Sequence, residues 1–227
     1  MLKRGFTLAE VLITLLIVGV VATLTTPALV KNVGSSKIGP QLAKFVNTWE
    51  TGTETFMMEE SISRLADENI HTFGTSGMKL LSKYIIMTNL NKIKSPTSIT
   101  LKNASGDDLD FLKIDLNSDK VWQLKDGTLV YFDQRMEGWF YYPSGSYKGF
   151  PTAFFVDIGG IKGSHRLGKE VFYFLQDSSG VLVPYGSNAH KSLLPEFTYN
   201  CSLSSSDFRE NLACTGAVAD NGYKAPW

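Results

Sequence analysis

Glu10 is the residue whose position most needs a chemical explanation, because it is a carboxylate inside a long apolar segment. It is the one charged residue between Phe6 and Val30. An ionised carboxylate in an apolar span is costly and usually has a partner. Cleavage between Gly5 and Phe6 would place a new α-amino group on Phe6, and Glu10 would become the fifth residue of the shortened chain. These residues therefore predict an ion pair between Glu10 and that amine, in the same chain or in a neighbour.

The apolar segment itself predicts a membrane-spanning helix. The 25 residues of 6–30 form roughly 37 Å of helix, which crosses a hydrocarbon core of about 30 Å with some tilt. Lys3 and Arg4 precede the segment and no comparable pair of basic residues directly follows it, so we expect the start to stay cytoplasmic and the rest to be exported. Pro27 removes one backbone hydrogen bond and is expected to kink the helix.

The string Gly5-Phe6-Thr7-Leu8-Ala9-Glu10, followed by an uninterrupted apolar helix, resembles the class III signal of type IV prepilins and type II secretion pseudopilins. The resemblance implies that a prepilin peptidase removes residues 1–5 and N-methylates Phe6. It also implies that Glu10 pairs with the amine of an adjacent subunit. The implied partners are the peptidase, other pilin or pseudopilin subunits and the inner (cytoplasmic) membrane, with a cell-surface or periplasmic filament after assembly. No cofactor is implied.

Two simpler interpretations compete with this one. An ordinary secretory signal would use Lys3 and Arg4 as its basic region and Val11 to Ala22 as its apolar region. Its cleavage site would fall beside Pro27, where a proline just before the cut is unfavourable. A plain membrane anchor explains neither the Gly5–Phe6 junction nor the acid that follows it.

Composition sets the class of the remaining chain. The protein has 227 residues, a formal net charge of zero and 43% hydrophobic residues. About 195 residues follow the anchor, enough for one globular domain with a hydrophobic core. A neutral chain lacks the basic excess of a dedicated nucleic-acid binder, so we expect nucleic-acid contact only if the filament serves DNA uptake.

The two cysteines, Cys201 and Cys214, lie close together. In an exported protein such a pair most simply forms a disulfide. Zinc is the alternative, but His71, His165 and His190 are scattered without ligand spacing. The position of the pair resembles the disulfide-bounded C-terminal loop of type IV pilins.

Helical periodicity resumes from Gly39. Leu42, Phe45, Val46, Trp49 and Phe56 lie on one apolar face. We expect residues 31–60 to continue the membrane helix as an amphipathic half, with a separate helix after a loop at 34–40 as the alternative. A further short helix is expected from the spacing of Met78, Leu81, Tyr84, Ile85 and Thr88.

Short runs of β-branched and aromatic residues follow. Strands are expected at 98–102, 109–116, 121–124, 128–132, 139–142, 152–158, 169–176 and 180–185. Asp126-Gly127 and the segment 177–180 are turn signals. Helices followed by an antiparallel sheet define an α+β fold. We expect a pilin-like globular domain at 61–227, in which the N-terminal helix packs on the C-terminal sheet and the disulfide closes a loop at 201–214.

The segment 157–168 is similar to the C-terminal sheet of a bacterial prepilin-like group with a D-x-N-G-x-K-G-P-N turn followed by L-G. Here Gly159 replaces the asparagine, and Ser164-His165 replaces proline–asparagine. Glycine and asparagine both accept positive φ, so the turn is expected to form, but a side-chain cap from the missing asparagine is lost.

Few other residues suggest chemistry. Asp115, Asn117 and Asp119 have the spacing that opens a calcium loop, with Asp126 at the twelfth position, but Lys120 replaces the required glycine. A solvated turn is the simpler interpretation. The chain contains no nucleophile or metalloprotease motif, so we expect a structural subunit, not an enzyme. The alternative is a monomeric, membrane-anchored extracytoplasmic binding module.

Overall fold

The computed structural model describes residues 7–65, 79–90, 96–132, 152–177, 179–194 and 197–226, with side chains for all of them except 24–36. The chain forms two compact units, Met1–Lys37 and Ile38–Trp227. Both units contain part of the longest element, helix α1, which runs from Leu8 to Glu59. The helix continues through 34–40, so the alternative of a loop at this point is wrong.

The second part of α1 packs through the predicted apolar face. Leu42 and Trp49 are fully buried, and Phe45, Val46 and Phe56 join them in one hydrophobic cluster. Two polar contacts fix the helix along its length. Lys44 Nζ donates to Asp126 Oδ2 at 2.9 Å, and the backbone N–H of Leu182 donates to Glu50 Oε1 at 3.1 Å. Burial of the apolar face, with about 25 cal/mol for each Å² removed from water, is the main force that holds this part of α1.

The sheet confirms the α+β class, with every strand pair antiparallel. Six strands pair in the order β1-β4-β5-β6-β7-β8, and β2 and β3 form a separate hairpin. The strands are β1 (Met87–Asn89), β2 (Ser98–Lys102), β3 (Asp108–Asp115), β4 (Val121–Leu124), β5 (Leu129–Tyr131), β6 (Thr152–Asp157), β7 (Val171–Gln176) and β8 (Leu182–Pro184).

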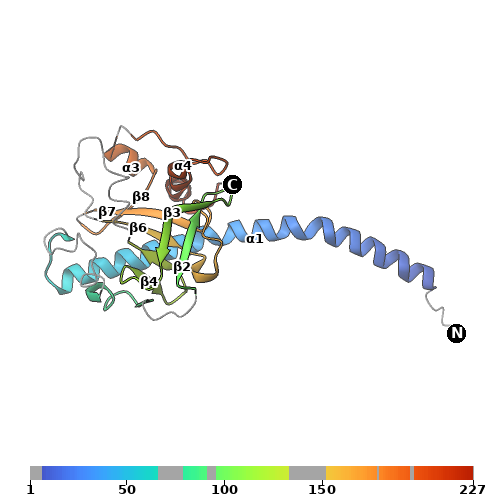
Figure 1. The fold of residues 1–227 in the computed structure, drawn as a ribbon, viewed down its shortest axis with the longest axis horizontal. Coiled ribbons are helices and arrows are strands. Elements are labelled where there is room, and N and C mark those ends of the chain that lie inside the picture. The colour runs from blue at the N-terminus through green and yellow to red at the C-terminus, as the bar shows by residue number, and fades with distance from the viewer. Residues whose placement is uncertain are drawn as a thin grey trace. The chain divides into compact units, whose positions relative to one another are not determined.

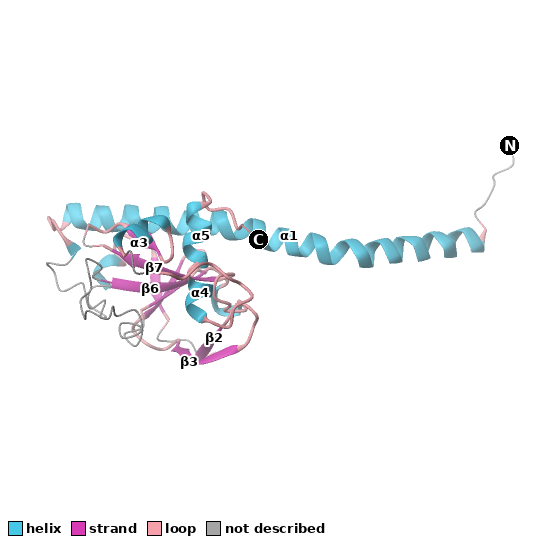
Figure 2. Cartoon of the chain, turned by 90° about the horizontal axis from the view of Figure 1, so that it is seen from above, coloured by secondary structure: helices cyan, strands magenta, loops and turns pink. Residues whose placement is uncertain are grey.

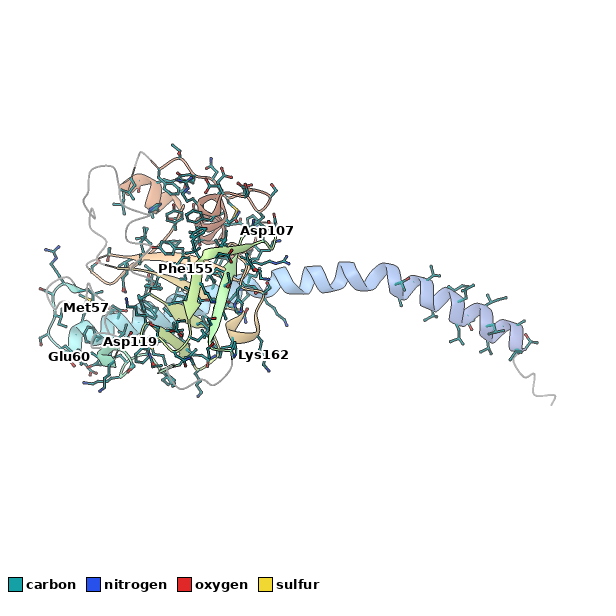
Figure 3. All side chains as sticks on the ribbon, in the orientation of Figure 1. Met57, Glu60, Asp107, Asp119, Phe155 and Lys162 are labelled. Atoms are coloured by element: carbon teal, nitrogen blue, oxygen red, sulfur yellow. A yellow bond between two sulfur atoms is a disulfide. The ribbon has the colours of Figure 1, made fainter. Side chains whose placement is uncertain are left out.

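The six-stranded sheet separates two hydrophobic clusters. One face packs against α1 from Ile38 onward, and the other packs against the β2–β3 hairpin and the C-terminal helices (Figures 1 and 2). Adjacent residues of the central strands alternate between the clusters, as Phe154 and Phe155 do. Figure 3 shows Phe155 in the interior and Asp107 and Lys162 toward the periphery. This layering follows from the two-residue period of the strands.

The expected strands at 98–102 and 121–124 have the predicted bounds, and five others differ by at most two residues at either end. The expected strand at 139–142 lies outside the described residues. The helix predicted from Met78 to Thr88 is wrong in its last part: residues 79–81 are helical, but Thr88 lies in β1. The physical reason is a long-range pairing, since Met87 and Asn89 face Leu124 and Trp122 of β4.

From Thr152 onward, the described residues contain four short helices: η3 (Gly160–Lys162), α3 (Asn188–Leu193), α4 (Phe208–Leu212) and α5 (Cys214–Asp220). The last three lie in the polar C-terminal segment, for which no helix was expected. Two of them have capping side chains that the sequence displays. Ser187 accepts a hydrogen bond from the N–H of His190, and Asp207 accepts one from the N–H of Arg209. Such caps are the usual helix start signals.

Two glycines in the second part of α1 allow close packing. A Cβ added to Gly39 would lie 1.6 Å from the carbonyl oxygen of Tyr223, and one added to Gly52 would lie 2.2 Å from Ile85 Cγ1. Glycine costs about 1 kcal/mol relative to alanine in a helix. At these two positions the cost is offset by the close approach of the C-terminal segment and of Ile85.

Candidate functional site

The start of α1 carries a reciprocal set of hydrogen bonds between Thr7 and Glu10. The backbone N–H and the hydroxyl of Thr7 both donate to Glu10 Oε2 at 2.8 Å. The backbone N–H of Glu10 lies 3.3 Å from Thr7 Oγ1, to which it donates. This is a capping box, in which two N–H groups at a helix start obtain acceptors from side chains. Glu10 therefore caps the start of α1, and it is also the carboxylate that was predicted to pair with the amine of Phe6.

Sequence reasoning missed this arrangement although its signal was present. Thr7-x-x-Glu10 directly before an apolar run is the capping-box pattern. The pattern accounts for Glu10, the first charged residue of α1, by hydrogen bonds within its own chain, so no second chain is needed to explain it. It also gives Thr7 a specific role, as the residue that caps the start of α1.

The predicted junction itself lies outside the described residues, which begin at Thr7. Gly5 and Phe6, the expected cleavage and methylation residues, therefore remain predictions at this point. Pro27 lies within α1, but its side chain is not described, so the predicted kink also remains a prediction.

The helix after the capping box exposes apolar side chains on all sides. The large residues that are exposed are Leu8, Val11, Leu12, Ile13, Leu15, Leu16, Ile17, Val18, Val20 and Val21. Leu8 is the most exposed, at 80%. Thr14 and Thr23 direct their hydroxyls to carbonyls of their own helix, so they leave no unpaired donor on this surface. In the described part of the chain, no helix is long and apolar enough to cross a membrane.

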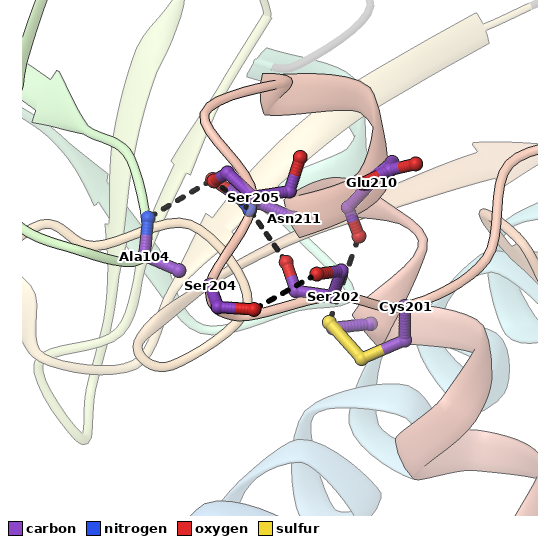
Figure 4. Close-up of a disulfide and its surroundings, with 8 residues drawn as sticks. Ala104, Cys201, Ser202, Ser204, Ser205, Glu210 and Asn211 are labelled. Atoms are coloured by element: carbon purple, nitrogen blue, oxygen red, sulfur yellow. Dashed lines mark hydrogen bonds between the residues drawn. A yellow bond between two sulfur atoms is a disulfide. The ribbon is translucent and has the colours of Figure 1, made fainter.

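The two cysteines form the predicted disulfide, and Asn211 ties its loop to the β2–β3 turn (Figure 4). Asn211 is fully buried. Its Oδ1 accepts from the N–H of Ala104 at 2.9 Å, and its Nδ2 donates to the carbonyls of Ser202 and Ser205. His190 and His165 bind protein groups elsewhere, and no cluster of three metal-ligating side chains occurs among the described residues.

The turn after β6 forms, but the positive φ expected at Gly159 is wrong: Gly159 has a φ of −74°, and Gly160 has the positive φ, 63°. Its caps were not predicted from the sequence. Asp157 is fully buried, and its carboxylate accepts from the N–H of Gly159 at 2.9 Å. Its other oxygen lies 2.7 Å from Tyr131 Oη and 2.6 Å from His165 Nδ1. Burial and the adjacent Asp157 carboxylate raise the pKa of Tyr131 well above its usual value. His165, which stands where the related group has asparagine, has a φ of 56°.

Glu170 closes the same turn from its other side. Its Oε2 accepts from the N–H and the hydroxyl of Ser164 and from the N–H of His165. Two carboxylates therefore cap this turn: Asp157, which the quoted pattern shares, and Glu170. The buried Asp157, Tyr131 and His165, with Glu170 nearer the surface, hold β5, β6 and the turn in one arrangement.

The predicted calcium candidates lie in the turn between β3 and β4. Asp115 Oδ1 accepts from the N–H of Asn117, and the carbonyl of Asp119 accepts from Asn89 Nδ2 and Trp122 Nε1. Partial burial opposes ionisation of Asp126, but hydrogen bonds from Lys44 and Thr128 lower its pKa overall. Asp126 is thus directed toward α1, away from the role of a twelfth-position ligand.

Comparison with known families identifies the N-terminal segment. The family described as prokaryotic N-terminal methylation motif matches residues 1–26. This motif is the prepilin-type cleavage and methylation signal of type IV pilin-like proteins. The chain therefore carries the signal of that class, as the resemblance predicted, and the α+β layout is consistent with a pilin-like fold. No curated protein and no solved structure matches the chain.

Proposed function

We propose that the protein is a structural subunit, a pilin or pseudopilin, of a type IV pilus or a type II secretion-like filament. The observation that carries the proposal is the methylation motif at residues 1–26. It is supported by the exposed apolar surface at the start of α1 and by a globular unit with its own hydrophobic core. The signal points to a structural protein and not to an enzyme.

Processing is the first step of the proposal. A prepilin peptidase cleaves between Gly5 and Phe6 and methylates the new amine of Phe6. Mass spectrometry of the protein from membranes of cells that express the peptidase tests this step. The expected product begins at N-methylated Phe6, and a mature chain that begins elsewhere would overturn the assignment.

Assembly is the second step. The protein first inserts in the inner membrane as a single-pass protein, with residues 38–227 outside the cytoplasm. The N-terminal helices of such subunits then pack together in the filament. Each subunit then buries the apolar residues that α1 exposes. Glu10 pairs with the Phe6 amine of a neighbour, since opposite charges attract strongly in an apolar environment. Pro27 is proposed to bend the helix between its packed part and the globular unit.

Substitution of Glu10 tests the charge pair. Glu10→Gln keeps the size of the side chain and removes the charge, so we expect filament incorporation to be lost while the globular unit still folds. The matched control is Glu54→Ala, which removes an exposed acid elsewhere on α1. Normal incorporation of the Glu10 variant would refute the pairing.

Crosslinking in cells separates this function from that of a membrane-anchored monomeric binding module. A filament subunit gives a ladder of crosslinked species that requires Glu10. A monomer gives no ladder, and that result would favour the binding module.

A further inference from the structure

Asn221 and Gly222, which directly follow α5, form a pair of residues that is prone to a chemical reaction of the main chain. The main-chain nitrogen of a residue can attack the side-chain amide carbon of a preceding asparagine. Glycine hinders this attack least, because it has no Cβ. Asparagine is accordingly one of the thermolabile residues of proteins. Asn-Gly occurs once in the whole sequence, so the sequence marks Asn221 as the most reactive asparagine.

The fold leaves this pair open to solvent. Asn221 and Gly222 are both exposed, and a Cβ added to Gly222 would meet no atom within 4 Å apart from its chain neighbours. Asn221 Nδ2 donates to the carbonyl of Lys224 at 2.9 Å, so the amide extends toward the residues that follow it. Water and hydroxide therefore reach the amide and the attacking nitrogen while the globular unit stays folded.

One hydrogen bond opposes the attack. The N–H of Gly222 donates to the carbonyl of Ala219 at 3.0 Å. This bond must open before the nitrogen can lose its proton and attack. A single hydrogen bond at an exposed helix end contributes little free energy, so it opens often without global unfolding. The fold is therefore expected to slow the reaction at Asn221 without preventing it.

Asn211 and Asn103 are better protected against the same attack. Both are buried, and the amide of each binds three partners in the protein. Asn200 is exposed like Asn221, but Cys201 follows it, and the side chain of a cysteine hinders the attacking nitrogen. Asn200 is therefore a control for exposure alone.

We propose that Asn221 is a site of spontaneous deamidation in the folded protein, and that its isoaspartate product loosens the contact of the C-terminal segment with Gly39 of α1. In the first step the nitrogen of Gly222 bonds to Cγ of Asn221, and the amide leaves as ammonia with the proton of that nitrogen. Water then opens the cyclic imide. Opening at the main-chain carbonyl gives isoaspartate, and opening at the other carbonyl gives aspartate.

The position of Tyr223 is the reason for the expected loosening. Isoaspartate adds one carbon to the main chain directly before Tyr223, and it adds a negative charge beside Asp220. The carbonyl oxygen of Tyr223 would lie 1.6 Å from a Cβ added to Gly39, and the N–H of Tyr223 donates to the carbonyl of Val218 at 2.9 Å. A segment that is packed this closely at both its N–H and its carbonyl does not accommodate a longer main chain. All these residues belong to 38–227, so the site does not depend on the proposed filament function.

Incubation of the full chain in detergent micelles at mildly alkaline pH tests the site, because base removes the proton from the attacking nitrogen. Peptide mapping by mass spectrometry measures asparagine, aspartate and isoaspartate at each position. We expect Asn221 to react before any other asparagine, about fivefold more slowly than in the same chain in urea, since one hydrogen bond must open. Equal rates at Asn221 and Asn200, or no reaction at Asn221 in the folded chain, would overturn the proposal.

Trypsin cleavage after Lys224, before and after the incubation, tests the effect of the product. We expect cleavage to become at least about threefold faster after incubation of the wild type, because the C-terminal segment opens more often. Asn221→Gln, incubated in parallel, should show no change, because glutamine forms the corresponding larger ring much more slowly. Asn221→Asp adds the charge without the extra main-chain carbon. Unchanged cleavage of the incubated wild type, or equally fast cleavage of fresh Asn221→Asp, would refute the loosening by isoaspartate.

Discussion

Asn211 and Ala104 are 107 residues apart in sequence, yet Asn211 Oδ1 accepts the backbone N–H of Ala104 at 2.9 Å inside the protein. The same amide group binds two carbonyls of the disulfide loop, those of Ser202 and Ser205. One side chain thus joins the β2–β3 hairpin to the segment that Cys201 and Cys214 close.

Replacement of Asn211 by alanine is expected to destabilise the globular unit by about 1–3 kcal/mol, because the buried N–H of Ala104 loses its acceptor. Urea unfolding of the full chain in detergent measures the change. Asn200→Ala is the control, since Asn200 is exposed and its Oδ1 accepts a surface hydrogen bond from Lys191 Nζ. Equal unfolding midpoints for the two variants would contradict the prediction.

His190 is expected to make the fold sensitive to acid. Burial, and to a smaller extent the charge of Lys191, lower its pKa from 6.5 to about 4. The imidazole packs against Tyr185 and Phe197, and Nδ1 accepts the N–H of Gly186, which requires an unprotonated nitrogen.

The folded state therefore favours neutral His190. Its contribution to stability is complete above about pH 6.5 and is lost as the pH falls toward 4, by about 3 kcal/mol at most. Unfolding free energies across this range, for the wild type and for His190→Gln, measure the effect. The variant should show a shallower pH dependence, and parallel curves would exclude this role of His190.

The capping box predicts a local effect of Thr7. Thr7→Val keeps the shape of the side chain but removes the acceptor of the Glu10 N–H, so the first turn of α1 should lose about 1 kcal/mol. Amide exchange at Glu10 should become about fivefold faster in NMR of the full chain in micelles. Thr14→Val is the matched control, because the Thr14 hydroxyl bonds only to helix carbonyls. Unchanged exchange in the Thr7 variant would show that the cap does not form.

Two glycines of α1, Gly19 and Gly39, are expected to respond differently to an added methyl group. Gly39→Ala is expected to destabilise the globular unit despite the better helix propensity of alanine, because the carbonyl of Tyr223 occupies the space. Gly19→Ala has no atom within 4 Å of the new Cβ and should leave the stability of that unit unchanged. Thermal unfolding and limited proteolysis at residues 221–226 measure both. A stabilised Gly39→Ala variant would contradict the packing.

Local sequence pattern predicted the elements whose residues repeat a simple period. The apolar face of α1 around Trp49 and the strand at 121–124 follow from spacing alone. The pattern failed at Thr88, because pairing with Gln123 of a distant strand decides the conformation there. Helix propensity over a few residues is weaker than such tertiary contacts.

The candidate sites also divide into those that a contiguous sequence reveals and those that only the fold brings together. The N-terminal signal is a contiguous string, so sequence alone was sufficient to find it. Asp157 contacts Tyr131 from another strand and His165 from the far side of a turn. The spacing of these residues in the sequence does not predict that they lie together. Asn211 was missed for the same reason.

The packing of Tyr223 on Gly39 has a consequence for biogenesis. Val218 and Tyr223 contribute to the same cluster as Ile38 and Leu42, so the core next to α1 remains incomplete until the chain has been synthesised through Tyr223. The segment at 38–59 is synthesised first, and its apolar face stays uncovered until nearly the whole globular unit has been synthesised. Completion of the core next to α1 therefore depends on Tyr223, far along the chain from the helix that it covers.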